Sequence, residues 1–257
     1  MNNYDKTPSF YNNEEVFNNF LKQTSYYKAI QECLLSIIKF TNPNHIVELG
    51  SATGSSSFLV AENFADKTIV GYDFRQNIVD EARRLNKFSN ASFECMDMVE
   101  FAKTNITADL VFMLHSFHHI VDPLNNKVEF LSNLYKNMKK GSFVCILEAF
   151  VPEECKLDDK ADIVKLWELR SNEGYASTFW NVIKDKQLTE ENIEKAEQIA
   201  AFCKENEYQA GLLVAERDNE YLVHRSWLKT QAEEIGFKVL LDQSINSIGE
   251  GVVLFQK

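Results

Sequence analysis

Residues 47–55 read Val47-Glu48-Leu49-Gly50-Ser51-Ala52-Thr53-Gly54-Ser55 and decide the fold. A short apolar run ending at Leu49 is typical of a buried parallel strand. Gly50 and Gly54 permit positive φ and a close approach of the backbone to a ligand, and the N–H groups at the start of a helix form a polar cradle. The stretch therefore predicts a strand, a turn that can hold a ligand, and a helix.

The spacing of the glycines also indicates which class of cofactor the loop does not favour. A dinucleotide-binding loop reads G-x-G-x-x-G. Here the glycines are four residues apart, Ala52 lies between them, and Ser55 stands at the third glycine position. The loop therefore disfavours a nicotinamide cofactor.

Outward from this turn, apolar runs and helical periodicities alternate along the chain. The expected elements are strand 45–49, helix 55–65, strand 68–73, helix 76–86, strand 91–95, strand 109–114, helix 126–138, strand 142–149, helix 224–235, strand 237–243 and strand 251–256. This rhythm predicts an α/β fold with a doubly wound, mostly parallel seven-stranded sheet and right-handed crossovers. The last two strands are expected to form an antiparallel hairpin.

The same pattern divides the chain into three parts. Residues 1–43 carry two apolar stripes at helical spacing and are expected to form N-terminal helices that act as a lid. The main domain combines residues 44–151 with 223–257. Residues 152–222 interrupt the alternation with a mainly helical, charged segment containing a Tyr/Trp cluster, and we expect a cap over the substrate.

The composition of the chain limits which kinds of binding partner are expected. The 257 residues carry a formal net charge of -11, and no basic stripe is evident, which disfavours nucleic acid. No stretch reaches the roughly 18 apolar residues of a membrane span. The five cysteines form no C-x-x-C pair, which argues against a disulfide framework or a zinc site. We expect a cytoplasmic protein without a metal that acts on a small molecule, and a homodimer is compatible with the sequence.

Acidic residues follow two further strands. Asp73 ends strand 68–73, about 20 residues past the glycine loop, where a carboxylate can accept hydrogen bonds from two ribose hydroxyls. Asp97 and Met98 follow strand 91–95 and can present an acid and an apolar side chain to an adenine. Ligands bind at the carboxyl ends of strands in open α/β sheets. A capping role is the alternative for an aspartate in such a position.

In these motifs the sequence resembles the class I S-adenosylmethionine (SAM)-dependent methyltransferases, over residues 44–150 and more loosely 224–257. VELGSATG looks like their first motif, and the segment 114–120, Leu-His-Ser-Phe-His-His-Ile, looks like the one after their fourth strand. The resemblance implies SAM as the cofactor and methyl transfer as the activity. Family members often carry a middle glycine where this chain has Ala52. The cofactor-binding residues that it implies are Glu48, Gly50, Ser51, Thr53, Gly54, Asp73, Phe74, Asp97, Met98, Leu114 and His115.

Methyl transfer from a sulfonium mainly requires alignment, and a general base helps when the acceptor is a hydroxyl or an ammonium. The candidate bases are His115, His118, His119, His224, Glu148 and Tyr175. Of these, His115, His118, Glu148 and Tyr175 are the expected catalytic residues. Packing or a role in the cofactor loop is the alternative for the histidines.

The segment 167–180 combines aromatic residues with an arginine and small polar residues. In a cap it could form the substrate pocket, with Arg170 pairing with a carboxylate and Tyr175 or Trp180 near the sulfonium. The alternative is that the aromatic residues fill the core of the insertion itself.

The leading hypothesis is O- or N-methylation of a small-molecule acceptor. The glycine loop also resembles that of the carboxy-SAM synthases, which need an arginine near the methionyl end, and Arg170 or Arg225 could serve. A non-catalytic SAM-binding protein is the third hypothesis.

Overall fold

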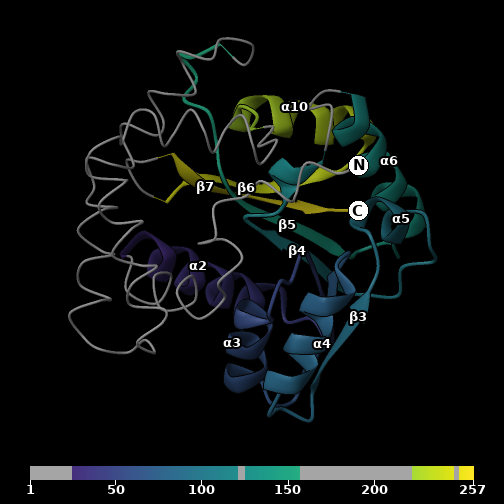
Figure 1. Cartoon of the computed structure of the whole chain (residues 1–257). Helices are drawn as coiled ribbons and strands as arrows, with labels where there is room; N and C mark the ends of the chain where they lie inside the picture. The colour runs from purple at the N-terminus through teal and green to yellow at the C-terminus, as the bar shows by residue number, and fades with distance from the viewer. Residues whose placement is uncertain (1–24, 121–124, 157–221, 246–248) are drawn as a thin grey trace.

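The computed structural model describes residues 25–120, 125–156, 222–245 and 249–257, and Figure 1 shows how its elements are arranged. The helices are α2 (Ser25–Thr41), α3 (Ser55–Asn63), α4 (Gln76–Leu85), α5 (Met98–Ala102), α6 (Asn125–Asn137) and α10 (Arg225–Ile235), with a short 3₁₀ helix η2 (Phe117–His119). The strands are β1 (His45–Leu49), β2 (Thr68–Asp73), β3 (Ala91–Cys95), β4 (Leu110–Leu114), β5 (Phe143–Ala149), β6 (Lys238–Ser244) and β7 (Glu250–Gln256).

The strands form one seven-stranded sheet in the order β3-β2-β1-β4-β5-β7-β6. The first five strands pair in parallel, and β7 is antiparallel to both β5 and β6. The order reverses between β1 and β4, which is the topological switch point where open α/β sheets bind ligands. The predicted doubly wound sheet and its antiparallel final hairpin are confirmed.

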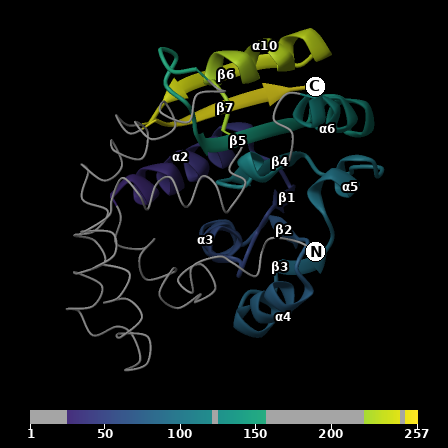
Figure 2. The ribbon, with the colours of Figure 1, turned by 45° about the horizontal axis from the view of Figure 1, so that its top comes forward.

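Helices cover both faces of the sheet, as Figure 2 shows. On one face, apolar residues of α5, α6 and α10 pack against β4, β5 and β7. On the other face, α2 packs against β5 and β7, α3 packs against β2 and β3, and α4 packs on β3 through Val79 and Ala82. None of the helices in the described ranges is long and apolar enough to cross a membrane.

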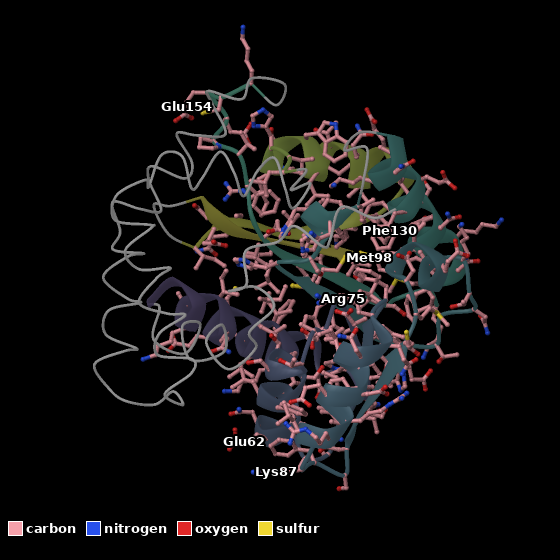
Figure 3. All side chains as sticks on the ribbon, in the orientation of Figure 1. Glu62, Arg75, Lys87, Met98, Phe130 and Glu154 are labelled. Atoms are coloured by element: carbon pink, nitrogen blue, oxygen red, sulfur yellow. The ribbon has the colours of Figure 1, made fainter. Side chains whose placement is uncertain are left out.

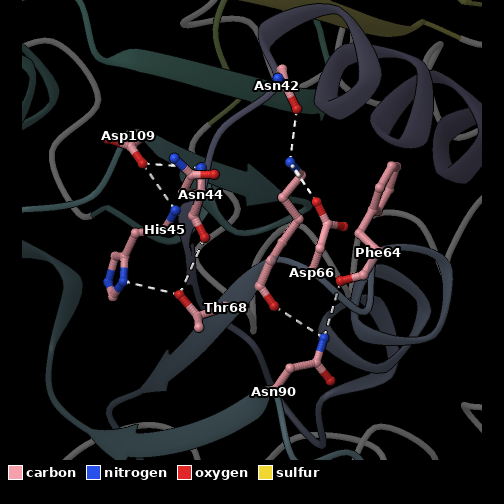
Figure 4. Close-up of polar contacts among 9 residues, drawn as sticks. Asn42, Asn44, His45, Phe64, Asp66, Thr68, Asn90 and Asp109 are labelled. Atoms are coloured by element: carbon pink, nitrogen blue, oxygen red, sulfur yellow. Dashed lines mark hydrogen bonds and ion pairs between the residues drawn. The ribbon is translucent and has the colours of Figure 1, made fainter.

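Polar contacts tie the amino ends of the strands together (Figure 4). The Asp109 carboxylate accepts hydrogen bonds from the backbone N–H groups of Asn44 and His45, at 3.0 and 2.9 Å. The Asn90 side-chain amide donates to the carbonyl oxygens of Phe64 and Lys67, each at 3.1 Å. These bonds satisfy loop backbone groups at the amino edge and leave the opposite, carboxyl edge for a ligand.

A neck joins the two described segments that flank residues 157–221. Val151 and His224 form an isolated parallel bridge, and the Val151 N–H donates to the Val223 carbonyl at 3.1 Å. The Glu153 carboxylate accepts from the Ser226 N–H at 3.1 Å and from its hydroxyl at 2.5 Å. The chain therefore leaves the sheet after β5 and returns beside the same point.

Most predicted elements match the structure within one or two residues. Helix α5 was not predicted, because five residues are too few to show a helical period. The first predicted N-terminal helix and most of the cap lie outside the described residues, so the lid and the cap stay predictions.

Candidate functional site

The glycine turn after β1 is fixed by hydrogen bonds to the end of β2. The backbone N–H groups of Gly50 and Ser51 both donate to the Tyr72 carbonyl, at 2.8 and 2.9 Å, and that of Ala52 donates to the Asp73 carboxylate at 3.1 Å. Gly50, Ala52 and Gly54 have φ values of 78°, 46° and 89°. The predicted turn is thus held open by left-handed residues, two of which are glycines.

A side chain at either glycine would collide with its surroundings. A Cβ atom on Gly50 would lie 2.4 Å from the Cβ of Ser116, and one on Gly54 would lie 2.5 Å from the Phe93 ring. The Ser116 hydroxyl donates to the Leu49 carbonyl at 2.6 Å, which presses the segment after β4 against the turn after β1. The site therefore depends on a close approach of two backbones at the switch point.

Asp73 ends β2 and is buried. One carboxylate oxygen accepts from the Ala52 N–H, and the other accepts from the N–H and the Nε of Arg75, at 3.0 and 3.2 Å. The Arg75 guanidinium also lies over the Phe74 ring, which is 44% exposed; Figure 3 labels Arg75. The structure therefore joins the predicted acid to the glycine turn and places an exposed aromatic ring beside it.

Asp97 and Met98 lie at the start of α5. The Asp97 side chain accepts from the backbone N–H groups of Val99 and Glu100 and so caps the helix. The Met98 side chain, labelled in Figure 3, reaches the site, because its Cε would lie 3.7 Å from a Cβ on Gly50. A cap uses only part of the capacity of a carboxylate to accept hydrogen bonds, so the predicted adenine contact of Asp97 stays a prediction.

The segment after β4 carries two histidines that pair with buried glutamates. His118 Nδ1 lies 2.9 Å from Glu148 Oε2, which also accepts from the His118 backbone N–H at 3.2 Å. His115 Nε2 lies 3.0 Å from Glu250 Oε2. Glu148 is the penultimate residue of β5 and Glu250 begins β7, and both are essentially inaccessible to solvent.

The surroundings of Glu148 favour its charged form. Burial alone would raise the pKa of this carboxyl, but the charge and hydrogen bond of His118, the charge of His115 and the Ala149 N–H lower the pKa to about 2. An ionised carboxylate on Nδ1 keeps the proton on that nitrogen in the neutral imidazole, so Nε2 is the basic atom. This arrangement suits His118 for proton transfer.

Glu48 has the opposite electrostatics. It is 2% exposed and accepts a 2.5 Å hydrogen bond from the Ser57 hydroxyl. Burial raises its pKa to about 8, although the hydrogen bonds from Ser57 and Ser56 lower it in part, and the charge of Asp73 adds to the rise. Glu48 is therefore mostly a neutral acid at pH 7 and links the end of β1 to the first turn of α3 through Ser57.

The Ser51 hydroxyl is buried in the glycine turn and has no hydrogen-bond partner in the described part of the chain, as suits a site built to hold a polar ligand. No cluster of three or more His, Cys, Asp or Glu side chains in the described ranges is arranged to hold a metal ion.

Residues 47–144 match the profile of the family described as "Methyltransferase domain". This stretch contains the glycine turn, Asp73, Asp97 and both histidines of the pairs. Over these residues the chain is similar to class I SAM-dependent methyltransferase domains, as its sequence motifs predicted.

The individual proteins to which the chain is similar are distant relatives. A carboxy-S-adenosyl-L-methionine synthase from Helicobacter pylori is 28% identical over 179 residues, which cover 67% of this chain and 64% of that protein. A malonyl-[acyl-carrier protein] O-methyltransferase from a Marinomonas species is 23% identical over 146 residues, which cover 54% of this chain and 53% of that protein. The chain thus spans less than two thirds of the length of these relatives.

Solved structures show the same fold. Human N-acetylserotonin methyltransferase in complex with SAM aligns with a TM-score of 0.55 and 14% identity, covering 88% of this chain and 51% of that one. The mitomycin 7-O-methyltransferase MmcR aligns with a TM-score of 0.56 and 16% identity, covering 91% of this chain and 54% of that one. The fold is that of SAM-binding methyltransferases.

Several predicted site residues do not meet in the described part of the domain. Arg170, Tyr175 and Trp180 lie outside the described residues. His224 belongs to the neck, where its Nδ1 lies 3.2 Å from the Val151 carbonyl. Arg225 pairs with Asp242 at 2.6 Å on the outer hairpin.

Three residues of the site were not among those predicted from the sequence, namely Arg75, Ser116 and Glu250. Arg75 follows the acid of β2 directly, so its position was a usable signal. The role of Ser116 depends on its approach to Gly50, which no local pattern encodes. Glu250 was detectable as a glutamate at the start of an otherwise apolar strand.

Proposed function

We propose that this chain methylates an oxygen or nitrogen atom of a small-molecule acceptor, with SAM as the methyl donor and His118, backed by Glu148, as the general base. The observation that carries the proposal is the 2.9 Å contact between His118 Nδ1 and the buried Glu148 carboxylate at the carboxyl edge of the sheet. When bound, SAM supplies a methyl group already activated on a sulfonium.

Four features support SAM as the ligand of this edge. Gly50 and Gly54 give the turn after β1 its left-handed backbone, and the buried hydroxyl of Ser51 has no hydrogen-bond partner among the described residues. Asp73 lies beside this turn, where its carboxylate can take up ribose hydroxyls. The exposed ring of Phe74 offers a flat apolar surface for an adenine.

His118 and Glu148 then act as a pair. Glu148 fixes the imidazole through Nδ1 and stabilises the imidazolium that forms when Nε2 takes a proton. Such a base contributes about 10²–10⁴-fold to the rate when the acceptor must lose a proton. Cationic acceptors and neutral hydroxyls need this help, whereas an acceptor that is already anionic does not.

The cofactor claim is tested with Asp73→Asn and Asp73→Ala in calorimetric titrations with SAM. Loss of a charged hydrogen-bond partner should weaken SAM binding by about 1.5–3 kcal/mol, or roughly 10–150-fold. Asp80→Asn, which removes an exposed aspartate of α4, is the matched control and should bind like the wild type. Unchanged SAM affinity in both folded Asp73 variants would falsify this part of the proposal.

The base is tested by measuring S-adenosylhomocysteine release with a panel of phenol, alcohol, amine and carboxylic-acid acceptors. His118→Gln should reduce kcat about 10²–10⁴-fold for acceptors that must be deprotonated and far less for carboxylates. His119→Gln is the control, because the two rings are neighbours with centroids 4.0 Å apart. Equal losses for all acceptors, or equal losses in both variants, would contradict the role of His118.

The relatives named carboxy-SAM synthases favour a second candidate, the formation of a carboxylated SAM derivative. That reaction needs an arginine near the methionyl end of SAM. Arg225 is less suited to this role because it pairs with Asp242, so Arg170 is the remaining candidate arginine. Mass spectrometry of the ligand that copurifies with the protein distinguishes the candidates. SAM or S-adenosylhomocysteine supports methyl transfer, and a carboxylated derivative supports the synthase reaction.

A further inference from the structure

Glu250 is a fully buried carboxylate at the carboxyl edge of the sheet. It is the first residue of β7, has no exposed surface, and lies 3.0 Å from His115 Nε2 through Oε2. Burying an ionisable group is costly unless it is paired. A glutamate in this place is therefore expected to have a role beyond packing.

His115 adopts a backbone conformation that an L-residue rarely takes. Its φ is 52°, its N–H donates to the Leu147 carbonyl at 2.9 Å, and the next residue, Ser116, is bound to Leu49. Such conformations persist only where the surroundings enforce them, and they concentrate at functional sites. The backbone is held on one side by β1 and β5, and Glu250 holds the imidazole.

The two histidine–glutamate pairs come from opposite faces of the sheet. Glu148 lies opposite Gly251 in the β5–β7 register, and Ala149 lies opposite Glu250. Because side chains alternate along a strand, Glu148 continues the face of Ile146, which packs towards α6 and α10. Glu250 continues the face of Val252, which packs towards α2 and α3.

We propose that Glu250 is a positioning residue of the reaction centre, which holds the strained His115 imidazole by its Nε2 atom so that the loop after β4 is fixed from both faces of the sheet. The role in a reaction rests on the function proposed above. The 3.0 Å contact is an ion pair without hydrogen-bond geometry, so the Glu250 carboxylate acts by stabilising the imidazolium form of His115.

The interaction between Glu250 and His115 is measured by nuclear magnetic resonance titration of the histidine Cε1 protons in the full chain, with SAM absent. The chain has five histidines, and His115→Gln assigns the resonance of interest. In Glu250→Gln the midpoint of the His115 titration should fall by about one pH unit or more. Glu148→Gln, measured in the same way, separates the contribution of the other carboxylate, whose charge also acts on His115.

Asp242→Asn is the matched control, because it removes a carboxylate from the same hairpin and breaks the contact with Arg225. It should leave the His115 midpoint unchanged. Glu250→Asp keeps the charge on a shorter side chain and should restore part of the midpoint and part of kcat, which loss of packing alone does not predict. If Glu250→Gln does not fold, the comparison of Glu250→Asp with Asp242→Asn decides.

The inference is overturned if His115 titrates identically in the wild type and the Glu250 variants, or if Asp242→Asn shifts it equally. A second readout is turnover. Glu250→Gln should shift the pH profile of kcat and should leave the KM for the acceptor nearly unchanged. Failure of the wild type to bind SAM in calorimetry would refute the proposed function, whereas the titration reports on the pair itself. The two failures are therefore distinguishable.

Discussion

Replacing Glu48 with glutamine should flatten the pH dependence of stability on the alkaline side. In the folded protein the Glu48 pKa is about 8, against an ordinary value of 4.5. Between these values the folded state holds a proton that the unfolded chain has released, so the wild type loses stability as the pH rises. At about 1.4 kcal/mol per pKa unit, the loss over this range is on the order of 5 kcal/mol.

Glutamine mimics the protonated acid, since its carbonyl can accept from Ser57 and its amide can donate as the acid proton does. Glu48→Gln should therefore resemble the wild type at pH 5 and exceed it at pH 8.5. At about 2–4 °C per kcal/mol for a chain of this size, the gap in Tm should reach roughly 10 °C or more.

The assay is thermal unfolding of the cofactor-free protein at half-unit steps from pH 4.5 to 9. Glu62→Gln is the control, because Glu62 is an exposed glutamate of α3, the helix that also carries Ser57. Its Tm should follow the wild type at every pH. A Glu48→Gln variant whose Tm declines as steeply as that of the wild type would refute the assignment of Glu48 as a buried neutral acid.

Three further outcomes are expected. Because the Glu148 pKa is depressed to about 2, the ionised carboxylate contributes to the free energy of unfolding above pH 4.5, and this contribution is lost as the pH falls through 2. Glu148→Gln should lower the free energy of unfolding by about 3 kcal/mol at pH 7. Denaturant titrations should show that this loss becomes smaller in acid. Ala52→Gly should relieve the left-handed conformation at φ 46° and change stability by at most about 1 kcal/mol, since the flexibility of glycine offsets the gain; a large loss in Tm would contradict this. Arg170→Ala and Trp180→Ala should lower turnover while calorimetric SAM affinity stays near wild type, and the cap hypothesis fails if only stability changes.

The sequence predicted the fold well because its signals are local. Apolar runs and helical periods repeat in register with glycine turns, so the strand order and the final hairpin followed from general topological rules. The placement of Gly50, Asp73 and Met98 at one edge also followed, because the carboxyl ends of parallel strands share that edge.

The histidine pairs were less accessible to prediction. His118 and Glu148 were both named as candidates, but their contact depends on the register of β5 against the loop after β4. Glu250 joins His115 across 135 positions of the sequence, through a strand inserted between β5 and β6. The left-handed backbone of His115 is set by these tertiary contacts and by no propensity of histidine.

The neck has a consequence for how such a domain can be rebuilt. Because Val151 and His224 lie side by side, whatever joins them closes a loop whose ends are already held together. Doubling the length of such a connection costs only about 0.6 kcal/mol in chain entropy. Segments of different length and composition can therefore be exchanged between residues 156 and 222 on an unchanged sheet, which allows the proposed cap to be replaced without altering the glycine turn.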